Sequence, residues 1–471
     1  MEVATELATL TPLTIASAAA DLRAGRLTSV ALTRTMFDRI DAAEGLGAFV
    51  CLTRDAAMQA ADAADADFTA GIDRGALQGI PLAVKDIIST ADAPTTANSR
   101  ILAPDWGGGV DAPVVARLRA AGAVIVGKST TSEFACGLPD PDTGFPVPRN
   151  PWSPQHSAGG SSSGTGVAVA AGLVLGGLGT DTGGSVRFPA ALNGHTGLKV
   201  TFGRVPKNGV VPLGFTLDSI GPMARSAEDC ALMLEVMAGA DLDDPSCAAA
   251  PVPMYSTLLD GGLEGVRIGV PMPYFFDSPG LDDEVRTAVL LAIDVLGAGG
   301  AEVSTTVVEH ARLAKEANAI TMGAEAFAYH RNDLVNRWTT YGRHTRMTLG
   351  RGAMFTAADY TQAQRFRAAF RRHLAELFTR FDVLATPTWP IPAPRIDDMA
   401  SEDNVIGPSF CGQWNLSGLP AVAVPCGFSS SGLPVSMQIV GRPFAEATVL
   451  GVAHAYQQVT DWHERVPPTL I

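Results

Sequence analysis

An apolar segment enclosed by small polar residues is the feature that most restricts how this chain can fold. The thirteen residues 166–178, GVAVAAGLVLGGL, follow the run SAGGSSSGT and precede the run GTDTGGSVR. A flexible linker is polar throughout, whereas a segment as apolar as this one must be buried. Glycines beside a buried segment indicate close backbone approach or a positive φ, so we expect both small-residue runs inside a folded site.

The composition fits a globular protein with a large interior. The chain has 471 residues, 46% of them hydrophobic and 17% charged, and a formal net charge of −14 at pH 7. This acidic balance argues against a nucleic-acid partner. No apolar run reaches the roughly 20 residues that cross a bilayer, and the N-terminus lacks the basic segment typical of a signal peptide. We therefore expect a cytoplasmic protein with no membrane partner.

Strand-like runs alternate with helical patterns along most of the chain. Short β-type runs at 81–87, 123–128 and 382–387 are separated by segments in which apolar residues recur every three to four positions. This alternation predicts one large α/β domain, with a central mixed, mostly parallel twisted sheet covered by helices on both faces. The expected parts of this single domain (1–471) are a helical N-terminal segment (1–75), a core (80–240), a variable helical region (309–380) and a C-terminal part of the core (381–471).

One segment matches the sequence pattern of a nucleotide-binding motif but not the structure that the motif requires. Residues 122–129, GAVIVGKS, match the pattern G-x-x-x-x-G-K-S. In a phosphate-binding loop the residues between the glycines curl around the phosphate, but Ala-Val-Ile-Val has the propensity of a β-strand. We interpret the match as a coincidence and keep a nucleotide-binding protein as a remote alternative.

Histidine- and metal-based sites have weak support. A Ser–His–Asp triad can be imagined from Ser185, His195 and either Asp181 or Asp218, but no G-x-S-x-G elbow surrounds Ser185. A structural role for His195 is the favoured interpretation. The eight histidines and six cysteines have no metal-ligand spacing, so we expect no metal and no other cofactor.

The run DTGGS can supply the hydrogen-bond donors of an active site. Its successive N–H groups can form an anion-binding nest, as an oxyanion hole requires. A base is then needed, and the apolar setting of Lys85 in PLAVKDI can lower the pKa of that lysine by desolvation. From composition alone, however, an ordinary ion pair between Lys85 and Asp86 is favoured.

Long motifs throughout the chain resemble the amidase signature family. The resemblance extends from about Thr14 to His463, with the motifs in the family's order. It implies the amidase signature fold, with residues 80–240 as the signature core. The motifs are GIPLAVKDI, AGAVIVGKSTTSEFA, RNPWSPQHSAGGSSSGTGVAVAAG, LGTDTGGSVRFPAALNG, GLKVTFGRVP, LDSIGPMARSAED and NLSGLPAVAVPCG.

The resemblance implies a Ser–Ser–Lys triad that forms an acyl-enzyme. Ser185 is the implied nucleophile, Ser161 the bridging serine after a cis Gly160–Ser161 bond, and Lys85 the base. Because Lys85 must be neutral to accept a proton, we expect activity to rise on the alkaline side. The implied oxyanion hole consists of the backbone N–H groups of Thr182, Gly183, Gly184 and Ser185.

The resemblance also suggests a substrate pocket. Ala135 and Cys136 match a segment that lines the acyl pocket in the family, and packing in the core is an equally supported role for them. We expect an apolar or aryl amide as the small-molecule substrate, with esters and carbamates as further options, water as co-substrate, and a monomer or homodimer. The helical region 309–380 would form the variable wall of this pocket, with ordinary helix packing as the alternative role for its aromatic residues Phe327, Tyr329, Trp338, Tyr341 and Phe355.

The alternative within the family is the glutaminase subunit of a tRNA-dependent amidotransferase. Members of that group usually carry an acid, which holds the glutamine α-amine, seven residues before the motif N-L-x-G. This chain has Pro408 at that position. We therefore expect a freestanding amidase in preference to a component of an amidotransferase.

Overall fold

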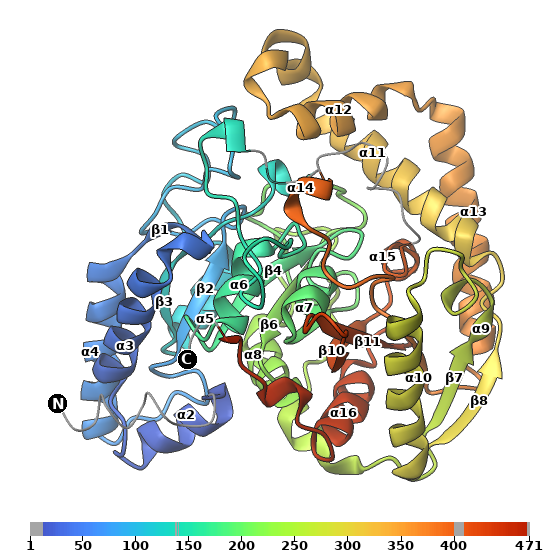
Figure 1. Cartoon of the computed structure of the whole chain (residues 1–471). Helices are drawn as coiled ribbons and strands as arrows, with labels where there is room; N and C mark the ends of the chain where they lie inside the picture. The colour runs from blue at the N-terminus through green and yellow to red at the C-terminus, as the bar shows by residue number, and fades with distance from the viewer. Residues whose placement is uncertain (1–12, 137–138, 140, 400–408, 469–471) are drawn as a thin grey trace.

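A sheet of eleven strands runs through the part of the chain that the computed structural model describes, residues 13–136, 139, 141–399 and 409–468. The strand order is β1-β3-β2-β4-β6-β5-β10-β11-β9-β7-β8, with helices on both sides (Figure 1). The expected α/β architecture with a mixed sheet is confirmed. The strands are β1 (Phe49–Leu52), β2 (Pro81–Lys85), β3 (Val124–Ser129), β4 (Gly176–Asp181), β5 (Thr196–Lys199), β6 (Ser219–Ala224), β7 (Arg267–Pro271), β8 (Glu302–Thr306), β9 (Val383–Pro387), β10 (Ala421–Phe428) and β11 (Pro434–Gly441).

The strand directions correct the expectation of a mostly parallel sheet. Of the ten neighbouring pairs among the described strands, four are parallel and six are antiparallel. The parallel pairs lie in two groups, β3-β2-β4 and β9-β7-β8. The middle of the sheet is antiparallel, and its strands β10 and β11 are joined by only five residues, too few for a helical crossover. Counting alternating strands and helices does not reveal such hairpins.

The N-terminal segment, which was expected to be helical, also contains a short strand. Residues 49–52 form β1, which pairs antiparallel with β3 at one edge of the sheet. Residues 1–12 of the expected segment 1–75 lie outside the described part of the chain. The helices of the described residues are α2 (Ile15–Arg23), α3 (Ser29–Ala42), α4 (Arg54–Thr69), α5 (Pro113–Ala120), α6 (Ser163–Ala170), α7 (Arg187–Asn193), α8 (Ala227–Met237), α9 (Met272–Phe275), α10 (Asp283–Ala298), α11 (Ala311–Asn336), α12 (Arg343–Arg351), α13 (Ala357–Leu377), α14 (Ile396–Met399), α15 (Gly412–Ser417) and α16 (Glu446–Gln457).

Two consecutive glycines of β4 show how helices cover both faces of the sheet. Successive residues of a strand point to opposite faces. A Cβ atom on Gly176 would lie 2.8 Å from the sulfur of Met233 in α8, and one on Gly177 would lie 2.7 Å from a methyl group of Thr165 in α6. The absence of side chains at these two positions therefore lets α8 and α6 pack closely against opposite faces of β4.

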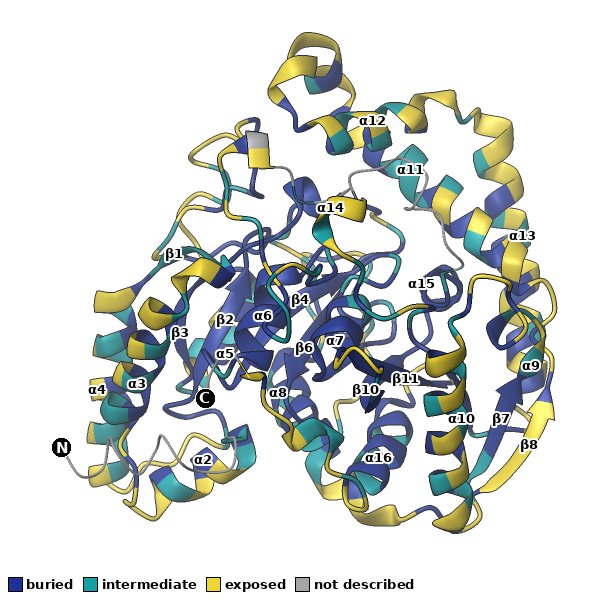
Figure 2. Cartoon of the chain, in the orientation of Figure 1, coloured by how far each residue is buried: buried dark blue, intermediate teal, exposed yellow. Residues whose placement is uncertain are grey.

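The apolar segment 166–178 is buried, as its composition predicts. It forms most of α6, a turn and the beginning of β4, and Gly172 in the turn is its one half-buried residue. In Figure 2, α6, α7 and the middle strands are almost entirely buried, whereas the exposed surface lies on outer helices such as α4, α12 and α13. Among the described residues, no helix combines the length and apolarity needed to cross a membrane.

Candidate active site

The fold brings the three expected catalytic residues to one edge of the sheet. Strands β2 and β4 are parallel neighbours, so their carboxyl ends, at Lys85 and Asp181, lie at the same edge. After Ser161 the chain runs away from this edge along helix α6, and it returns to the edge along strand β4. Ser161, just before α6, and Ser185, just after β4, are therefore brought close to Lys85, and both serines line one cavity.

Lys85 is a buried lysine between two hydroxyl groups. Its Nζ atom lies 2.8 Å from Ser161 Oγ and 2.8 Å from Thr180 Oγ1. Complete burial lowers the pKa of Lys85 to about 7, although the negative charges of Asp218 and Asp181 oppose this shift. A lysine with this pKa is partly neutral at physiological pH and can accept a proton. Sequence reasoning did not identify Thr180, although it directly precedes the run DTGGS.

The ion pair that composition favoured for Lys85 does not form. Asp86 instead pairs with Lys128 of the neighbouring strand β3, with 3.1 Å between Nζ and Oδ1. The chain turns directly after Lys85, where the N–H groups of Ile87 and Ile88 donate to the Lys85 carbonyl oxygen, and the side chain of Asp86 in this turn diverges from that of Lys85. This divergence leaves Lys85 Nζ with the two hydroxyl partners.

The backbone around Ser161 is fixed by neighbouring residues. The Gly160–Ser161 peptide bond is cis, which confirms the prediction. The carbonyl oxygen of Ser161 accepts hydrogen bonds from the N–H of Ser132 at 3.2 Å and from Thr131 Oγ1 at 2.9 Å. These contacts hold the backbone of Ser161 in place while its hydroxyl contacts Lys85.

One of the four expected oxyanion-hole donors is already engaged. The N–H of Gly184 donates to Asp181 Oδ1 at 2.8 Å, so it is not available to a substrate in this structure. The N–H groups of Gly183 and Ser185 have no acceptor among the described residues. Gly184 has a φ of +133°, and a Cβ atom there would lie 2.8 Å from Cys411 Cβ, so both backbone conformation and space require glycine.

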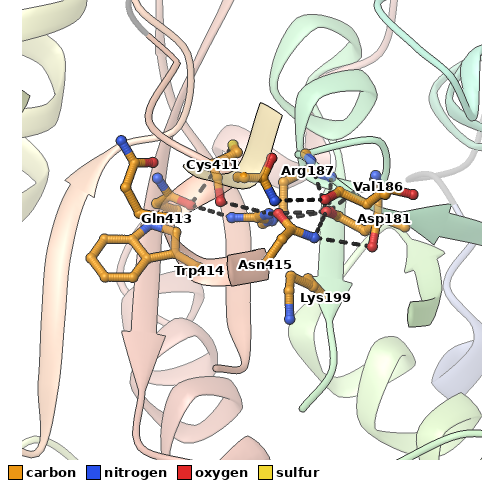
Figure 3. Close-up of polar contacts among 12 residues, drawn as sticks. Asp181, Val186, Arg187, Lys199, Cys411, Gln413, Trp414 and Asn415 are labelled. Atoms are coloured by element: carbon orange, nitrogen blue, oxygen red, sulfur yellow. Dashed lines mark hydrogen bonds and ion pairs between the residues drawn. The ribbon is translucent and has the colours of Figure 1, made fainter. Parts of the chain in front are cut away.

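A buried ion pair anchors the loop that carries Ser185 (Figure 3). Asp181 pairs with Arg187 at 3.0 Å and accepts a hydrogen bond from Asn415 Nδ2 at 2.8 Å. Burial alone would raise the pKa of Asp181, but the charge and hydrogen bonds of Arg187, with help from Lys199 and Asn415, hold it well below its ordinary value. Arg187 also donates to Gln438 Oε1 at 3.0 Å. Asp181 and Arg187, which flank the loop, are therefore each held by a further residue, Asn415 and Gln438 respectively.

The cavity beside these residues has a volume of about 380 Å³. Ala135 and Cys136 line it, as the resemblance implied. Gly159, Gly160, Gly183 and Gly184 leave backbone exposed to it, and Phe188 and Trp389 stack against each other at its side with ring centroids 3.8 Å apart.

The variable region forms one wall of this cavity, but with other residues than expected. Met322 of α11 and five residues of α12 line it, and none of the five predicted aromatic residues does. Tyr341, for example, is buried against His330 and Phe134, with its hydroxyl 3.0 Å from His330 Nδ1. The helical pattern did not reveal which face each aromatic residue occupies. The α12 residues are Arg343, His344, Met347, Thr348 and Arg351, so this wall carries positive charge.

The alternative sites from the sequence are not assembled. His195 is buried, its Nδ1 lies 2.9 Å from the carbonyl oxygen of Thr196, and burial lowers its pKa to about 4. Asp218 accepts a hydrogen bond from Thr182 Oγ1 at 2.5 Å and does not contact His195. No described interaction joins His195 to Ser185, which supports a structural role for this histidine.

The segment 122–129 is not a phosphate-binding loop. Residues 124–129 form β3, which pairs with β1 on one side and β2 on the other. Their backbone groups are therefore used within the sheet, and Lys128 is buried against Asp86. Among the described residues, no group of three or more histidine, cysteine or acidic side chains is arranged to hold a metal ion.

Comparisons with known proteins show the family to which the chain belongs. The family model described as Amidase matches residues 31–450. A glutamyl-tRNA(Gln) amidotransferase subunit from Roseiflexus sp. (strain RS-1) is 43% identical, over 97% of this chain and 98% of the relative. The native peptide amidase from Stenotrophomonas maltophilia is 31% identical with a TM-score of 0.82, over 98% of this chain and 99% of that one.

A third relative comes from a structure described as a vestigial protein complex that reveals the evolutionary origins of an s-triazine catabolic enzyme. It is 33% identical with a TM-score of 0.88, over 95% of this chain and 98% of that one. The family match, the full-length relatives and the shared fold lead to the same assignment. This chain belongs to the amidase signature family.

Proposed function

We propose that this chain hydrolyses a carboxylic amide with Ser185 as nucleophile, Ser161 as proton relay and Lys85 as base. The observation that carries this proposal is the 2.8 Å contact between Lys85 Nζ and Ser161 Oγ at the cavity that Ser185 also lines. The lowered pKa of Lys85, about 7, supplies the neutral amine that the relay requires.

The reaction follows from this arrangement. Lys85 accepts the proton of Ser161, Ser161 accepts that of Ser185, and the Ser185 oxygen bonds to the amide carbon. The N–H groups of Gly183 and Ser185 stabilise the oxyanion. The proton then passes through Ser161 to the leaving nitrogen as the C–N bond breaks. Water attacks the acyl-enzyme by the same relay, so one amide and one water give one acid and one amine.

The comparisons favour an amidotransferase subunit over the apolar-amide enzyme that the sequence favoured. The identity to the Roseiflexus amidotransferase subunit, 43%, exceeds the 31% to the peptide amidase. The side-chain amide of glutamine is then the substrate, and partner subunits receive the ammonia. The positively charged wall from α12 is also better suited to a substrate that carries a carboxylate than to a neutral apolar one.

A freestanding amide hydrolase is the second candidate. The match to a peptide amidase at 31% identity, over nearly the full length of both chains, supports this candidate. Pro408, at the position of the acid usual in glutaminase subunits, also favours it. Pro408 lies outside the described residues, so the structure adds nothing on this position.

The test is a substrate panel on the purified chain, with glutamine, other primary amides, anilides, esters and carbamates, read by mass spectrometry and ammonia release. Turnover of amides by the chain alone supports the freestanding enzyme. Glutamine hydrolysis that appears only with amidotransferase partner subunits supports the amidotransferase role. Replacing Lys85, Ser161 or Ser185 by alanine is expected to remove most turnover, whereas His195→Ala is expected to retain it. The reverse pattern would overturn the Ser–Ser–Lys mechanism.

A further inference from the structure

Asn318 of helix α11 is a buried polar residue that contacts the loop carrying Ser185. It is 5% exposed, and its Nδ2 atom donates to the carbonyl oxygen of Thr182 at 3.3 Å. No other described residue donates a hydrogen bond to this carbonyl. A Cβ atom on Gly183 would lie 3.4 Å from Asn318 Oδ1, so the amide group packs directly against the loop backbone.

The carbonyl that Asn318 binds belongs to the same peptide group as an oxyanion-hole donor. The C=O of Thr182 and the N–H of Gly183 are the two ends of one peptide group, which is trans. A trans peptide group is planar, and its C=O and N–H point in opposite directions. A hydrogen bond that holds the carbonyl toward Asn318 therefore holds the N–H of Gly183 on the opposite side, where Gly183 lines the active-site cavity.

The second free donor of the loop is held in a comparable way. The N–H of Ser185 shares its peptide group with the carbonyl of Gly184, which accepts a hydrogen bond from the N–H of Phe188 at 2.6 Å. That contact is between backbone groups, so changing a side chain does not remove it. The contact to Gly183 comes from a side chain, so its contribution can be measured by mutation.

We propose that Asn318 is a positioning residue for the oxyanion hole: it fixes the Thr182–Gly183 peptide group so that the Gly183 N–H can bind the oxyanion. This inference rests on the proposed function, because it assumes that Ser185 attacks an amide carbon. A donor that is fixed before the reaction needs no reorganisation as the charge develops. The hydrogen bond from Asn318 also polarises the peptide group, which strengthens its N–H as a donor.

Asn318 touches neither the substrate nor a transferred proton in this scheme. The Ser185 oxygen bonds to the carbonyl carbon, the π electrons of that carbonyl move to its oxygen, and the Gly183 N–H binds the resulting oxyanion. This hydrogen bond is stronger in the transition state than in the bound substrate. Losing its alignment is therefore expected to lower kcat and to leave KM nearly unchanged, whereas a loss of substrate contact would raise KM.

The experiment measures kcat and KM for the best amide of the panel above, and Ki for a trifluoromethyl ketone with the same acyl group. Ser185 adds to the ketone carbon, its proton passes to Ser161, and the oxygen of the tetrahedral adduct occupies the oxyanion hole. Asn318→Ala is expected to lower kcat about tenfold and to raise Ki about tenfold, with KM within about threefold. Complete loss of one donor costs about 10²- to 10³-fold in other enzymes. Partner subunits are supplied if the panel requires them.

A second variant keeps the shape of the side chain. Asn318→Asp, when ionised, places an acceptor instead of a donor against the Thr182 carbonyl, so kcat is expected to fall further than in Asn318→Ala. Thermal melting verifies that each variant folds. If the alanine variant does not fold, the aspartate variant provides the test.

Thr321→Val is the matched control on the same helix. Thr321 is fully buried, its Oγ1 donates to the carbonyl oxygen of Ala317 at 2.7 Å, and it accepts a hydrogen bond from Gln364 of α13 at 3.0 Å. Its substitution removes buried hydrogen bonds without a contact to the Ser185 loop. We expect a loss of stability, with kcat, KM and Ki within about twofold of wild type.

Each outcome separates this inference from the proposed function. Unchanged kcat and Ki in the folded Asn318 variants, a change confined to KM, or an equal loss of kcat in Thr321→Val overturns the role of Asn318 alone. Failure of wild type to hydrolyse any amide of the panel, with or without partner subunits, overturns the proposed function and this inference with it.

Discussion

Two buried lysines at the ends of strands, Lys85 in β2 and Lys199 in β5, differ only in their neighbours. Both are fully buried, and burial lowers the pKa of each to about 7. Lys85 Nζ contacts the hydroxyl groups of Ser161 and Thr180. Lys199 Nζ donates instead to two backbone carbonyl oxygens, those of Val200 at 2.8 Å and Leu419 at 2.7 Å.

The comparison shows that a lowered pKa does not by itself identify a base. A carbonyl oxygen has no proton to give, so Lys199 can only donate where it lies. Lys85 contacts a hydroxyl that lines the candidate active-site cavity, whereas Lys199 does not line that cavity. Burial lowers the pKa of both lysines, but only Lys85 contacts a hydroxyl group from which it could accept a proton in the proposed relay.

The largest expected difference between the two lysines is in turnover. Lys85→Met removes the proposed base, so kcat is expected to fall on the order of 10³-fold or more. The measurement is kcat on the best substrate of the panel, with circular dichroism to verify folding. Retention of more than a tenth of wild-type kcat in folded Lys85→Met would remove the distinction between the two sites.

Asp181 lies near both lysines and opposes the lowering of both pKa values. Asp181→Asn leaves Arg187 buried without its counter-charge, so the variant is expected to lose about 3–5 kcal/mol of stability. Denaturant unfolding measures this loss. A change below about 1 kcal/mol would mean that the remaining acceptors of Arg187, including Asn415 and Gln438, are sufficient.

The pH dependence of kcat/KM tests which lysine acts as the base. Lys85 must lose a proton to act, and its pKa is about 7, so kcat/KM is expected to rise about tenfold per pH unit below 7 and to level off above it. The same midpoint is expected in Lys199→Met, because the charge of Lys199 is not among the causes that shift Lys85. A midpoint displaced in Lys199→Met would mean that the two lysines titrate together.

Lys199→Met is expected to have the smallest effect on turnover, with kcat within about threefold of wild type. The substitution leaves the carbonyl oxygens of Val200 and Leu419 without their donor, so it is expected to cost about 1–3 kcal/mol of stability. Thermal melting and kcat of the folded protein measure the two effects. A large loss of kcat without a loss of stability would contradict the structural role of Lys199.

The parts of the site that could be predicted are those carried by continuous motifs. Lys85, Ser161 and Ser185 lie in long motifs, and the resemblance of those motifs to the amidase signature family implied the triad, whereas composition alone favoured an ion pair between Lys85 and Asp86. Ser132 lies in such a motif too, but the motif does not show that its buried Oγ atom lacks a hydrogen-bond partner among the described residues. That property exists only once the surrounding side chains are in place.

Contacts between distant segments could not be predicted. The hydrogen bond from Arg187 to Gln438, 251 positions away in the sequence, depends on where the two segments meet after folding. The prediction that aromatic residues line the cavity wall was wrong for a similar reason. Tyr341 packs inside the helical region, and the charged side chains of α12 line the cavity instead. Local patterns indicate helices but do not determine which neighbour each face contacts.

The buried contacts of Arg187 have a consequence for the timing of activity during synthesis. Asn415 in α15 and Gln438 in β11 bind this arginine, and β10 enters the sheet between β5 and β11. A nascent chain that ends before α15 already contains Lys85, Ser161 and Ser185, yet it lacks the residues that fix the Ser185 loop. We expect such a ribosome-bound or truncated chain to hydrolyse nothing, which an activity assay on a chain stopped at residue 409 tests. We therefore expect hydrolysis to begin only after the last strands have emerged from the ribosome.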